Sequence, residues 1–572
     1  MKQFKRFLKY TRPYRLKIIL ALLCAFVTSL AAIISTFFSG LAIDTMIGSG
    51  AVNFASLARI LTALAVIYIV SSLFQWFISR YANQVSYLIV RDIRRDIFAS
   101  LNRQPLSFFD GHPHGDIVSR FTNDADSLSD ALAVSITGFF TGIVTIIASL
   151  IFMLFLNIPL TVTILVVTPI CIVVAARLTV FSQKTFRKQQ QEVGNLSAYI
   201  SENVGNQRVV KAFSREKQAE EDFNKISDDL YNAASRAMFA SALVNPTTRF
   251  VNNIGYIAVG LTGGILAITS GTSVGILSSF LIYSTQFAKP FNELSGITNQ
   301  LQTAFASLGR IFALIDAEPE TPDIPNAGEL SDCKGEVVFD HVSFSYTPDR
   351  PLIKDFNFKA QPGQMTAIVG PTGCGKTTLV NLLMRFYDVT SGAILIDGKN
   401  IQNLTRDSLR RSFGMVLQDA WIFDGTIRDN IAYGNPKASD EQIMQAARAA
   451  YAHSFIKRMP NGYDTYINAD TLSQGQRQLI TIARAMLADP AMLILDEATS
   501  SIDSLTEIRT QKAFLTLMDG KTSFVIAHRL STIVTADCIL VMKDGNIIEQ
   551  GSHSKLLEKK GFYYDLYNSQ FH

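Results

Sequence analysis

The sequence predicts a fusion of two folds: an α-helical membrane domain with six transmembrane helices and long cytoplasmic extensions, followed by an α/β domain with a phosphate-binding loop. Apolar residues make up 48% of the 572 residues and charged residues only 17%, against about 25% charged residues in soluble proteins. Six long apolar stretches lie in the first half, and glycine-rich and acidic motifs follow in the second. We expect the membrane domain at residues 1–317, a proline-interrupted linker at 318–334 and the α/β domain at 335–572.

The apolar stretches are long enough to cross a bilayer, which requires about 20 mostly apolar residues in a helix. The expected spans are Ile18–Ile43, Leu57–Ile78, Ala131–Leu156, Pro159–Ala176, Val251–Thr269 and Val274–Phe287. The first is too long for the apolar core of a cleavable signal peptide, so we expect it to be retained. The sixth helix should continue past Lys289 into the cytoplasm. Charges at helical spacing, as in Lys211–Asp222, predict that helices also extend into the two long loops.

Lysine and arginine are distributed unevenly among the connecting segments. They are absent from residues 44–56, 157–158 and 270–272, and frequent in the N-terminus and in residues 80–130 and 177–249. Positively charged loops stay on the cytoplasmic side, so both termini and both long loops are predicted to be cytoplasmic. In the absence of a targeting segment, we expect a multi-pass protein of a bacterial plasma membrane.

Composition also limits the partners. A net charge of +4 over 572 residues gives no reason to expect a nucleic acid. The five cysteines contain no C-x-x-C pair, so neither a disulfide framework nor a zinc site is indicated. The predicted spans contain almost no ionisable side chains, which proton-driven transporters and ion channels usually carry along their pathway. A lipophilic or amphipathic cargo is therefore favoured, with membrane lipids around the spans.

The second domain contains a glycine-rich loop between an expected strand and an expected helix. Met365–Val369 has the pattern of a buried strand, Gly370–Thr377 fits G-x-x-x-x-G-K-[ST], and Leu379–Arg385 is expected to be helical. Glycines let backbone N–H groups converge on phosphate oxygens, and the helix N-terminus adds partial positive charge. Lys376 would reach the β- and γ-phosphates, and the Thr377 hydroxyl would ligate Mg²⁺. By itself the pattern also fits a turn that only caps a helix.

Acidic residues and a histidine follow two further apolar strands. Asp496 and Glu497 come directly after Met492–Leu495. Asp496 could orient the Mg²⁺ shell there, and Glu497 could activate the attacking water as a general base. His528 follows Ser523–Ala527 and could hydrogen-bond a γ-phosphate. Each piece also has a structural explanation, a turn or a structural histidine, but the ordered set is very specific.

Taken in order, these motifs resemble those of ATP-binding cassette (ABC) exporter half-transporters over essentially the whole chain. The resemblance implies ATP-driven export of a drug, lipid or peptide, with ATP and Mg²⁺ as cofactors. The implied nucleotide-binding residues are Tyr346, Gly370, Pro371, Thr372, Gly373, Cys374, Gly375, Lys376, Thr377, Thr378, Gln418, Ser473, Gln474, Gly475, Gln476, Asp496 and His528. The implied catalytic residues are Glu497, His528, Gln418 and Lys376, and the implied Mg²⁺ ligands are Thr377, Gln418 and Asp496.

The resemblance also assigns parts to individual segments. Tyr346 would stack on adenine, and Gln418 would couple the nucleotide site to the membrane domain. Leu472–Gln476 matches the signature motif, and Ser500–Asp503 the D-loop. The two coupling loops would be Gly115–Arg120 with Asn123 and Asp124, and Val209–Phe213. Cys374 lies at a helix N-terminus, which can lower a thiol pKa, so we expect alkylation there to block ATPase activity.

The glycine-rich segment Gly370–Thr378 matches the family's Walker A loop. In the family, ATP binds between the Walker A loop of one domain and the signature motif of another, so the resemblance implies a dimer. The signature here contains Gln474 where the family most often has glycine, and the segment from Tyr466 to Thr471 before it is short and lacks the usual acidic, glycine-containing stretch. An altered signature beside intact catalytic residues favours a heterodimer with a second half-transporter. A homodimer that tolerates Gln474 is the alternative.

Three other functions fit part of this pattern. A soluble ABC ATPase would have no use for six apolar spans. An ABC importer normally keeps its membrane and ATPase domains on separate chains, although a few exporter-shaped proteins import. An ATP-gated channel or regulator of the same fold is a further alternative, which flux without hydrolysis would support.

Overall fold

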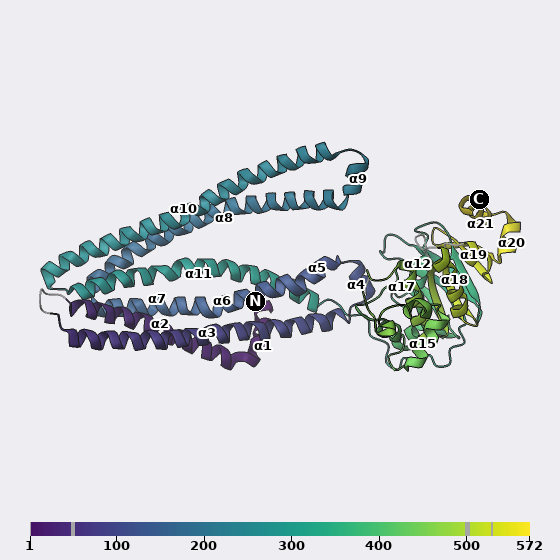
Figure 1. Cartoon of the computed structure of the whole chain (residues 1–572), viewed down its shortest axis with the longest axis horizontal. Helices are drawn as coiled ribbons and strands as arrows, with labels where there is room; N and C mark the ends of the chain where they lie inside the picture. Colours follow the sequence, from purple (N-terminus) through teal and green to yellow (C-terminus); the bar gives the residue numbers. More distant parts are fainter. Residues whose placement is uncertain (1, 47–51, 469, 498–503, 528–529, 572) are drawn as a thin grey trace. The chain divides into compact units, whose positions relative to one another are not determined.

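A computed structural model of the chain describes residues 2–46, 52–468, 470–497, 504–527 and 530–571. It contains two compact units, drawn in Figure 1. The helical unit comprises Met1–Arg103 and His112–Glu318, and the α/β unit comprises Gln104–Gly111 and Pro319–His572.

Long helices make up almost all of the helical unit, with 3-10 (η1) and π-helical (η2, η3) turns between some of them. They are α1 (Lys2–Thr11), η1 (Arg12–Tyr14), α2 (Arg15–Asp44), α3 (Phe54–Leu101), α5 (His114–Ser119), η2 (Arg120–Asp124), α6 (Ala125–Val134), η3 (Ser135–Phe139), α7 (Phe140–Leu156), α8 (Ile158–Gly205), α9 (Gln207–Ala212), α10 (Glu216–Ser270) and α11 (Val274–Ile315). The six predicted spans lie on α2, α3, the run from α6 to α7, α8, α10 and α11. Within the described residues, four helical stretches are long and apolar enough to cross a membrane, Lys5–Asp44, Phe54–Leu101, His114–Leu156 and Asn253–Ser270, and a shorter apolar helix covers Ile158–Ile170.

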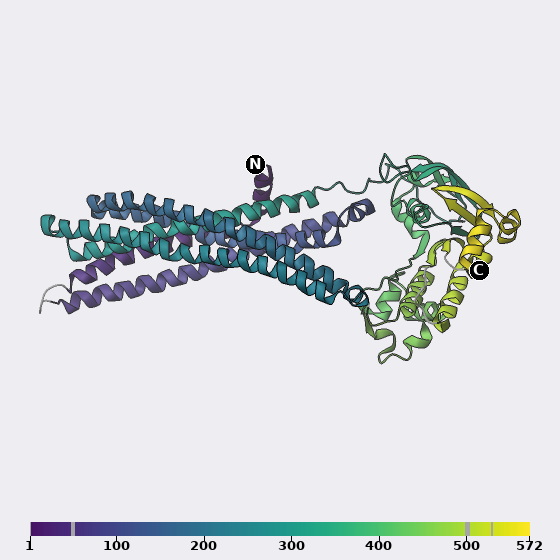
Figure 2. The same cartoon turned by 90° about the horizontal axis from the view of Figure 1, so that it is seen from above.

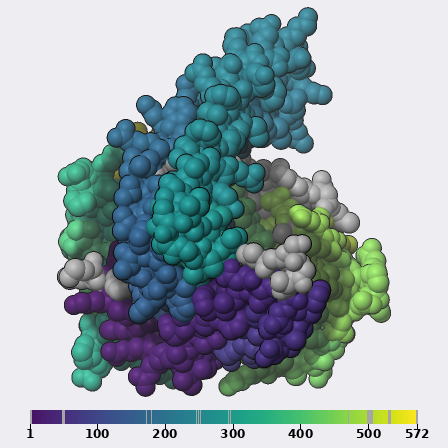
Figure 3. All heavy atoms as spheres, turned by 90° about the vertical axis from the view of Figure 1, so that its left-hand side faces the viewer, coloured from purple at the N-terminus to yellow at the C-terminus, as the bar shows by residue number. Residues whose placement is uncertain are grey.

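Helices α8 and α10 run side by side and diverge from the remaining helices toward α9 (Figure 1), a separation also visible in the end-on view of Figure 3. The other helices pack lengthwise against one another (Figure 2). Polar contacts join α2 to α11 inside this bundle. Tyr283 Oη donates to the Ile33 carbonyl over 2.8 Å, and Gln286 Nε2 donates to Thr36 Oγ1 over 2.9 Å. Buried polar groups need such partners, and here they fix the register between the two helices.

The end of the α8–α10 hairpin at α9 differs from the sequence prediction. A charged helix face was expected over Lys211–Asp222, and the structure divides this segment, because α9 ends at Ala212 and α10 begins at Glu216. Ser214 between them has a φ of 52°, in the left-handed region that helices do not continue through. The charges therefore mark the reversal of the hairpin as well as a helix face.

The α/β unit contains strands and shorter helices. They are α4 (Leu106–Asp110), β1 (Val337–Phe344), β2 (Ile353–Ala360), β3 (Met365–Val369), α12 (Lys376–Leu383), β4 (Ser391–Ile396), β5 (Lys399–Asn400), η4 (Ile401–Asn403), α13 (Arg406–Arg411), β6 (Phe413–Val416), β7 (Gly425–Thr426), α14 (Ile427–Ala432), α15 (Asp440–Ala449), α16 (His453–Ile456), η5 (Gly462–Asp464), β8 (Tyr466–Ile467), α17 (Gln474–Ala488), β9 (Met492–Glu497), α18 (Ser504–Met518), β10 (Thr522–Ala527), α19 (Leu530–Val534), β11 (Cys538–Lys543), β12 (Asn546–Gly551), α20 (His553–Lys559) and α21 (Phe562–Phe571). The strands form sheets in the orders β2-β1-β4-β5, β12-β11-β3-β10-β9-β6 and β7-β8.

The six-stranded sheet is buried on both faces, which explains its continuous apolar runs. In β9, Leu493 and Leu495 belong to one core and Met492 and Ile494 to the other. Successive side chains of a strand point to opposite faces, so a parallel strand covered on both sides needs apolar residues at every position. The same rule accounts for β3 and β10.

Some boundaries differ from the sequence prediction for local reasons. The apolar residues at 337–339 and 342–346 have the pattern of two strands, but β1 is one strand with an irregular register between Phe339 and Val342, where His341 has a φ of 49°. The helix expected at Leu379–Arg385 instead begins at Lys376, and Arg385, with a φ of 50°, lies beyond its end.

Candidate functional site

The glycine-rich loop connects β3 to α12 through backbone conformations that favour glycine. Gly370 and Gly375 have φ values of 154° and 102°. A Cβ on Gly370 would also lie 2.3 Å from the Met542 carbonyl oxygen, so a side chain is excluded there. Lys376 begins α12, and its Nζ donates to the carbonyls of Gly370 and Pro371 over 2.8 and 3.1 Å. The ammonium thus folds back over the loop, beside a helix N-terminus, in an arrangement that fits a phosphate chain.

Tyr346 follows β1 and presents a partly open aromatic face. Its side chain is 48% exposed, and its Oη lies 3.2 Å from Thr378 Oγ1 at the start of α12. Phe344 and Tyr387 meet it edge-on, with ring centroids 4.9 and 5.0 Å away. These neighbours fix the ring near the loop, where a purine could stack on it.

Three neighbouring parallel strands bring the acidic and amide candidates to one edge. Register pairs Val416 of β6 with Leu495 of β9, and Ile526 of β10 with Asp496. Gln418 and Asp496 therefore leave the sheet side by side. β3, which leads into the glycine-rich loop, pairs with β10 on the other side. Ligands of open α/β sheets bind outside the carboxyl ends of the strands, and the glycine-rich loop, Gln418 and Asp496 lie at this edge.

The signature segment forms the start of a well-capped helix. Ser473 is the N-cap of α17, and its Oγ accepts from the Gln476 backbone N–H over 3.3 Å while Gln476 Oε1 accepts from the Ser473 N–H over 3.1 Å. Gly475 is buried behind it. This reciprocal capping box fixes the first turn of α17 at an exposed Ser473, and the partial positive charge of a helix N-terminus favours an anion there.

Comparisons with known proteins cover both units. Residues 18–291 match the family model described as the ABC transporter transmembrane region, and residues 353–500 match the one described as ABC transporter. The fatty acid ABC transporter ATP-binding/permease protein of Mycobacterium bovis is 43% identical over 517 residues, which is 90% of this chain and 82% of that protein. The chain belongs to the ABC transporter family.

Further relatives agree with this assignment. The ATP-dependent lipid A-core flippase of Syntrophus aciditrophicus is 36% identical over 575 residues, covering 99% of this chain and 94% of the flippase. A solved structure of a bacterial Atm1-family ABC exporter with ATP bound has a TM-score of 0.75 and 29% identity, and it covers 98% of this chain and 99% of that chain. The protein is therefore an ABC exporter half-transporter with fused membrane and ATPase domains, and its ATPase domain binds ATP.

Two predicted parts of the site, His528 and the D-loop segment Ser500–Asp503, lie outside the residues that the structure describes. Glu497 is the last residue of β9, and only its backbone position is described.

The expectation that the Cys374 thiol has a lowered pKa is wrong. Its side chain is only 4% exposed and packs in the core between the two larger sheets. Burial raises the pKa of the Cys374 thiol, and the Lys376 ammonium offsets only part of that rise. A position at a helix N-terminus lowers a thiol pKa where the sulfur is accessible, whereas here desolvation dominates.

Two sets of residues near the site were not singled out from the sequence. Tyr387 packs on Tyr346, and its Oη donates to Asp110 Oδ2 of α4 over 2.5 Å. The coupling segment expected at Gly115–Arg120 therefore begins just after α4, the part of this loop that belongs to the α/β unit. No motif marks Asp110 in the sequence, because a single acidic residue in a loop carries no spacing signal.

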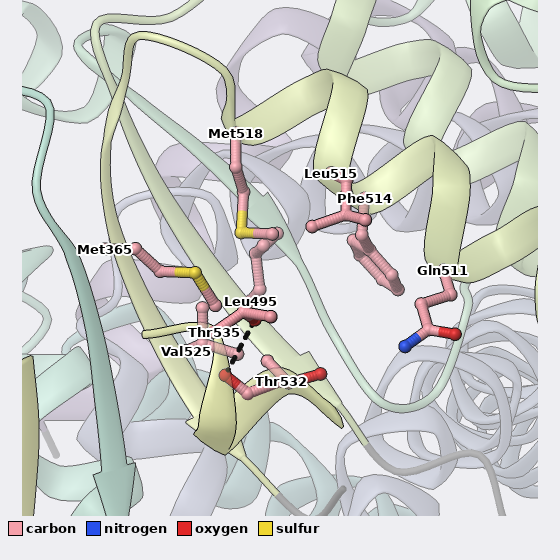
Figure 4. Close-up of a pocket in the computed structure, with 9 residues that line it drawn as sticks. All are labelled: Met365, Leu495, Gln511, Phe514, Leu515, Met518, Val525, Thr532 and Thr535. Atoms are coloured by element: carbon pink, nitrogen blue, oxygen red, sulfur yellow. Dashed lines mark hydrogen bonds between the residues drawn. The ribbon is translucent and has the colours of Figure 1, made fainter. Parts of the chain in front are cut away.

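The second set lines a groove of about 850 Å³ beside Gln418. Arg484 of α17 lies in it, with its guanidinium 5.7 Å from the Trp421 ring centroid and 5.1 Å from that of Tyr433. Its Nε donates to the Asn430 carbonyl over 2.9 Å. A smaller apolar cavity of about 70 Å³ lies between α18, α19 and the sheet (Figure 4) and contains none of the predicted site residues.

Proposed function

We propose that the transporter uses ATP to export fatty acids or other lipid-like molecules from the cytoplasmic side of a bacterial plasma membrane. The observation that carries this proposal is the 43% identity to a fatty acid transporter over 90% of the chain. The near absence of ionisable groups from the predicted spans supports a lipophilic cargo, because polar pathways in membranes usually carry such groups.

The proposed nucleotide site uses the residues gathered around the glycine-rich loop. Lys376 and the loop N–H groups bind the β- and γ-phosphates, and Tyr346 stacks on the base. Thr377, Gln418 and Asp496 supply the hydroxyl, amide and carboxylate oxygens that Mg²⁺ prefers. Mg²⁺ would neutralise charge on the phosphates when bound. Glu497 accepts the proton of the attacking water, and His528 donates a hydrogen bond to the γ-phosphate.

We further propose that the transporter works as a dimer, because the signature helix can complete a nucleotide site only on another chain. The cytoplasmic part of the α8–α10 hairpin supports this. It leaves large apolar side chains exposed, among them Tyr231 at 71%, Met238 at 71% and Phe239 at 67%. Apolar residues grouped outside the lipid-facing region usually mark a protein interface.

A heterodimer is the favoured arrangement. Gln474 departs from the usual glycine of the signature while Asp496 and Glu497 are intact. Such a combination fits a heterodimer with two unequal nucleotide sites. The site at this chain's glycine-rich loop, Asp496 and Glu497 hydrolyses ATP, and the site that this chain's signature motif completes on the partner is less active. The nucleotide-driven closing of the dimer would pass through Gln418 and the cytoplasmic loops to the helices, which then open outward.

ATPase measurements on the assembled transporter in lipid nanodiscs, with a partner half-transporter where the chain alone is inactive, test the proposed site. Glu497→Gln should lower turnover by at least about 100-fold while ATP still binds, because the amide cannot accept the proton of the water. Lys376→Ala, as the matched control for binding, should instead lose nucleotide affinity. Near-normal turnover of Glu497→Gln would disprove the assigned base.

Stimulation of this ATPase activity by candidate substrates tests the proposed class of cargo. Long-chain fatty acids added to the nanodiscs should stimulate wild-type turnover and leave Glu497→Gln unchanged. Stimulation by polar solutes but not by fatty acids would contradict the proposed substrate class.

A further inference from the structure

The Tyr346 ring lies beyond the end of a strand, and neighbouring side chains hold it in place. β1 ends two residues earlier, at Phe344. The Tyr346 Oη lies 3.2 Å from Thr378 Oγ1 and accepts from Asn381 Nδ2 over 3.4 Å. The rings of Phe344 and Tyr387 stand nearly perpendicular to the Tyr346 ring, at interplanar angles of 84° and 88°. A ring that its neighbours hold in one orientation binds a stacked base more tightly, because less freedom is lost on binding.

The backbone of Tyr387 is fixed through the residue two positions before it. Arg385 is only 5% exposed, and its Nη1 donates to the carbonyls of Ile401 and Leu404 over 3.1 and 3.0 Å. These hydrogen bonds place the chain at Tyr387, but they do not set the torsion angles of the Tyr387 side chain. The position of the Tyr387 ring therefore depends on contacts that the ring and its hydroxyl make.

Asp110 supplies the contact at the hydroxyl end of Tyr387. It is the last residue of α4, 277 positions earlier in the chain, and its Oδ2 accepts from Tyr387 Oη over 2.5 Å. Burial raises the pKa of Tyr387, and the hydrogen bond to Asp110 adds to the rise, so the phenol stays protonated and remains the donor at neutral pH. A hydrogen bond to an ionised carboxylate is stronger than one between neutral groups, which suits a contact that fixes a side chain.

We propose that Tyr387 and Asp110 are positioning residues for the nucleotide base. The Asp110 carboxylate fixes the Tyr387 phenol, and the Tyr387 ring in turn fixes the Tyr346 ring on which the base stacks. This role rests on the proposed stacking of the base on Tyr346. Its effect is confined to ligands that carry a base, because the phosphates bind to Lys376 and the N–H groups of the glycine-rich loop rather than to these rings.

Equilibrium binding to the full-length protein in lipid nanodiscs tests this role with two probes. One is AMP-PNP, a non-hydrolysable analogue of ATP, and the other is inorganic tripolyphosphate, which has no base. Tyr387→Phe keeps the ring and removes its hydroxyl, and Asp110→Ala removes the acceptor. Tyr563→Phe is the matched control, because it removes a phenol that bonds His553 over 2.7 Å in the same unit. Tyr346→Ala tests the stacking itself.

Tyr387→Phe and Asp110→Ala should each bind AMP-PNP about 5-fold more weakly than wild type and bind tripolyphosphate equally well. The double variant should lose no more than either single variant, because both changes break the same hydrogen bond. Unchanged AMP-PNP affinity in both single variants, an equal loss for tripolyphosphate, or an equal loss in Tyr563→Phe would overturn the positioning role. If Tyr346→Ala still weakens AMP-PNP binding in that case, the stacking role stands. Unchanged AMP-PNP affinity in Tyr346→Ala would overturn both roles.

Discussion

Cys374 lies in the phosphate-binding loop and at the same time in the hydrophobic core. The sequence places it at a helix N-terminus, where a thiol is expected to be acidic. The structure places its sulfur beneath the loop, in the core between the two larger sheets. Spacing in a motif reports which residues are neighbours along the chain, but whether a side chain points to solvent or to the core depends on packing that the motif does not contain.

Alkylation kinetics test the buried position of Cys374. Because burial raises the pKa of its thiol and only the thiolate reacts, N-ethylmaleimide at pH 7 should leave ATPase activity essentially unchanged. The rate of modification should rise as pH approaches the raised pKa, since the thiolate fraction increases there. Peptide mass spectrometry reports the modified cysteine, and Cys374→Ala serves as the control. Rapid inactivation at pH 7 that Cys374→Ala abolishes would contradict this prediction.

Gln474 illustrates the opposite case, in which the structure explains why a departure from the family pattern is tolerated. It is the first residue of α17, and its backbone φ is not in the left-handed region. The backbone here does not require glycine, and glutamine is the better helix former. What Gln474 changes is the side chain offered to a nucleotide on the partner, and this is where its functional consequence is expected.

A buried polar network joins two elements of the helical unit that are far apart in the sequence. Asp124 of η2, at 7% exposure, accepts from Arg310 Nε and Nη2 of α11 over 2.9 and 2.5 Å. Ser307 Oγ donates to the same carboxylate over 2.9 Å. The network fixes η2, in the first predicted cytoplasmic loop, to the last part of α11, from which the chain continues to the ATPase domain.

Asp124→Ala should therefore destabilise the helical unit by about 2 kcal/mol, the order expected when hydrogen bonds to a charged group are lost and Arg310 remains half exposed. Asp126→Ala is the matched control. Asp126 pairs with Arg94 over 2.7 Å, but its side chain is 66% exposed, so its loss should cost less than about 1 kcal/mol. Thermal unfolding in detergent measures both variants. Equal decreases in unfolding temperature for the two variants would show that burial of the Asp124 network does not add to the stability of the helical unit.

Elements with strong local signals were predictable, and elements defined by long-range packing were not. β3, β9 and β10 are continuous apolar runs because both faces of their sheet are covered, and the sequence predicts them within one or two residues. The reversal at Ser214 and the grouping of α4 with the α/β unit depend on how distant segments pack. The contact between Asp110 and Tyr387 joins residues 277 positions apart, which no local pattern can indicate.

On the scale of the whole molecule, the family and the fused order of the two domains followed from the apolar spans of the first half and the order of the motifs in the second. The glycine-rich loop, Gln418 and Asp496 lie at the carboxyl ends of β3, β6 and β9 of one sheet, so their order along the chain follows the topology of that sheet, whereas the signature motif begins α17. The roles of the individual site residues rest on that placement and stay predictions until variants are measured. The number and identity of chains in the assembly do not follow from it, because a composite site can be completed by either the same or a different chain.

The mass and ATPase activity of the protein purified alone in nanodiscs decide between these assemblies. If the chain is one half of a heterodimer, it should be folded but monomeric or nearly inactive alone, because two copies of a signature with Gln474 would complete both sites poorly. Activity should then rise when a second half-transporter with an unaltered signature is added. An active dimer alone, with activity lost in Glu497→Gln, would establish a homodimer. Gln474 would in that case be a tolerated variant, as its ordinary helical backbone already permits.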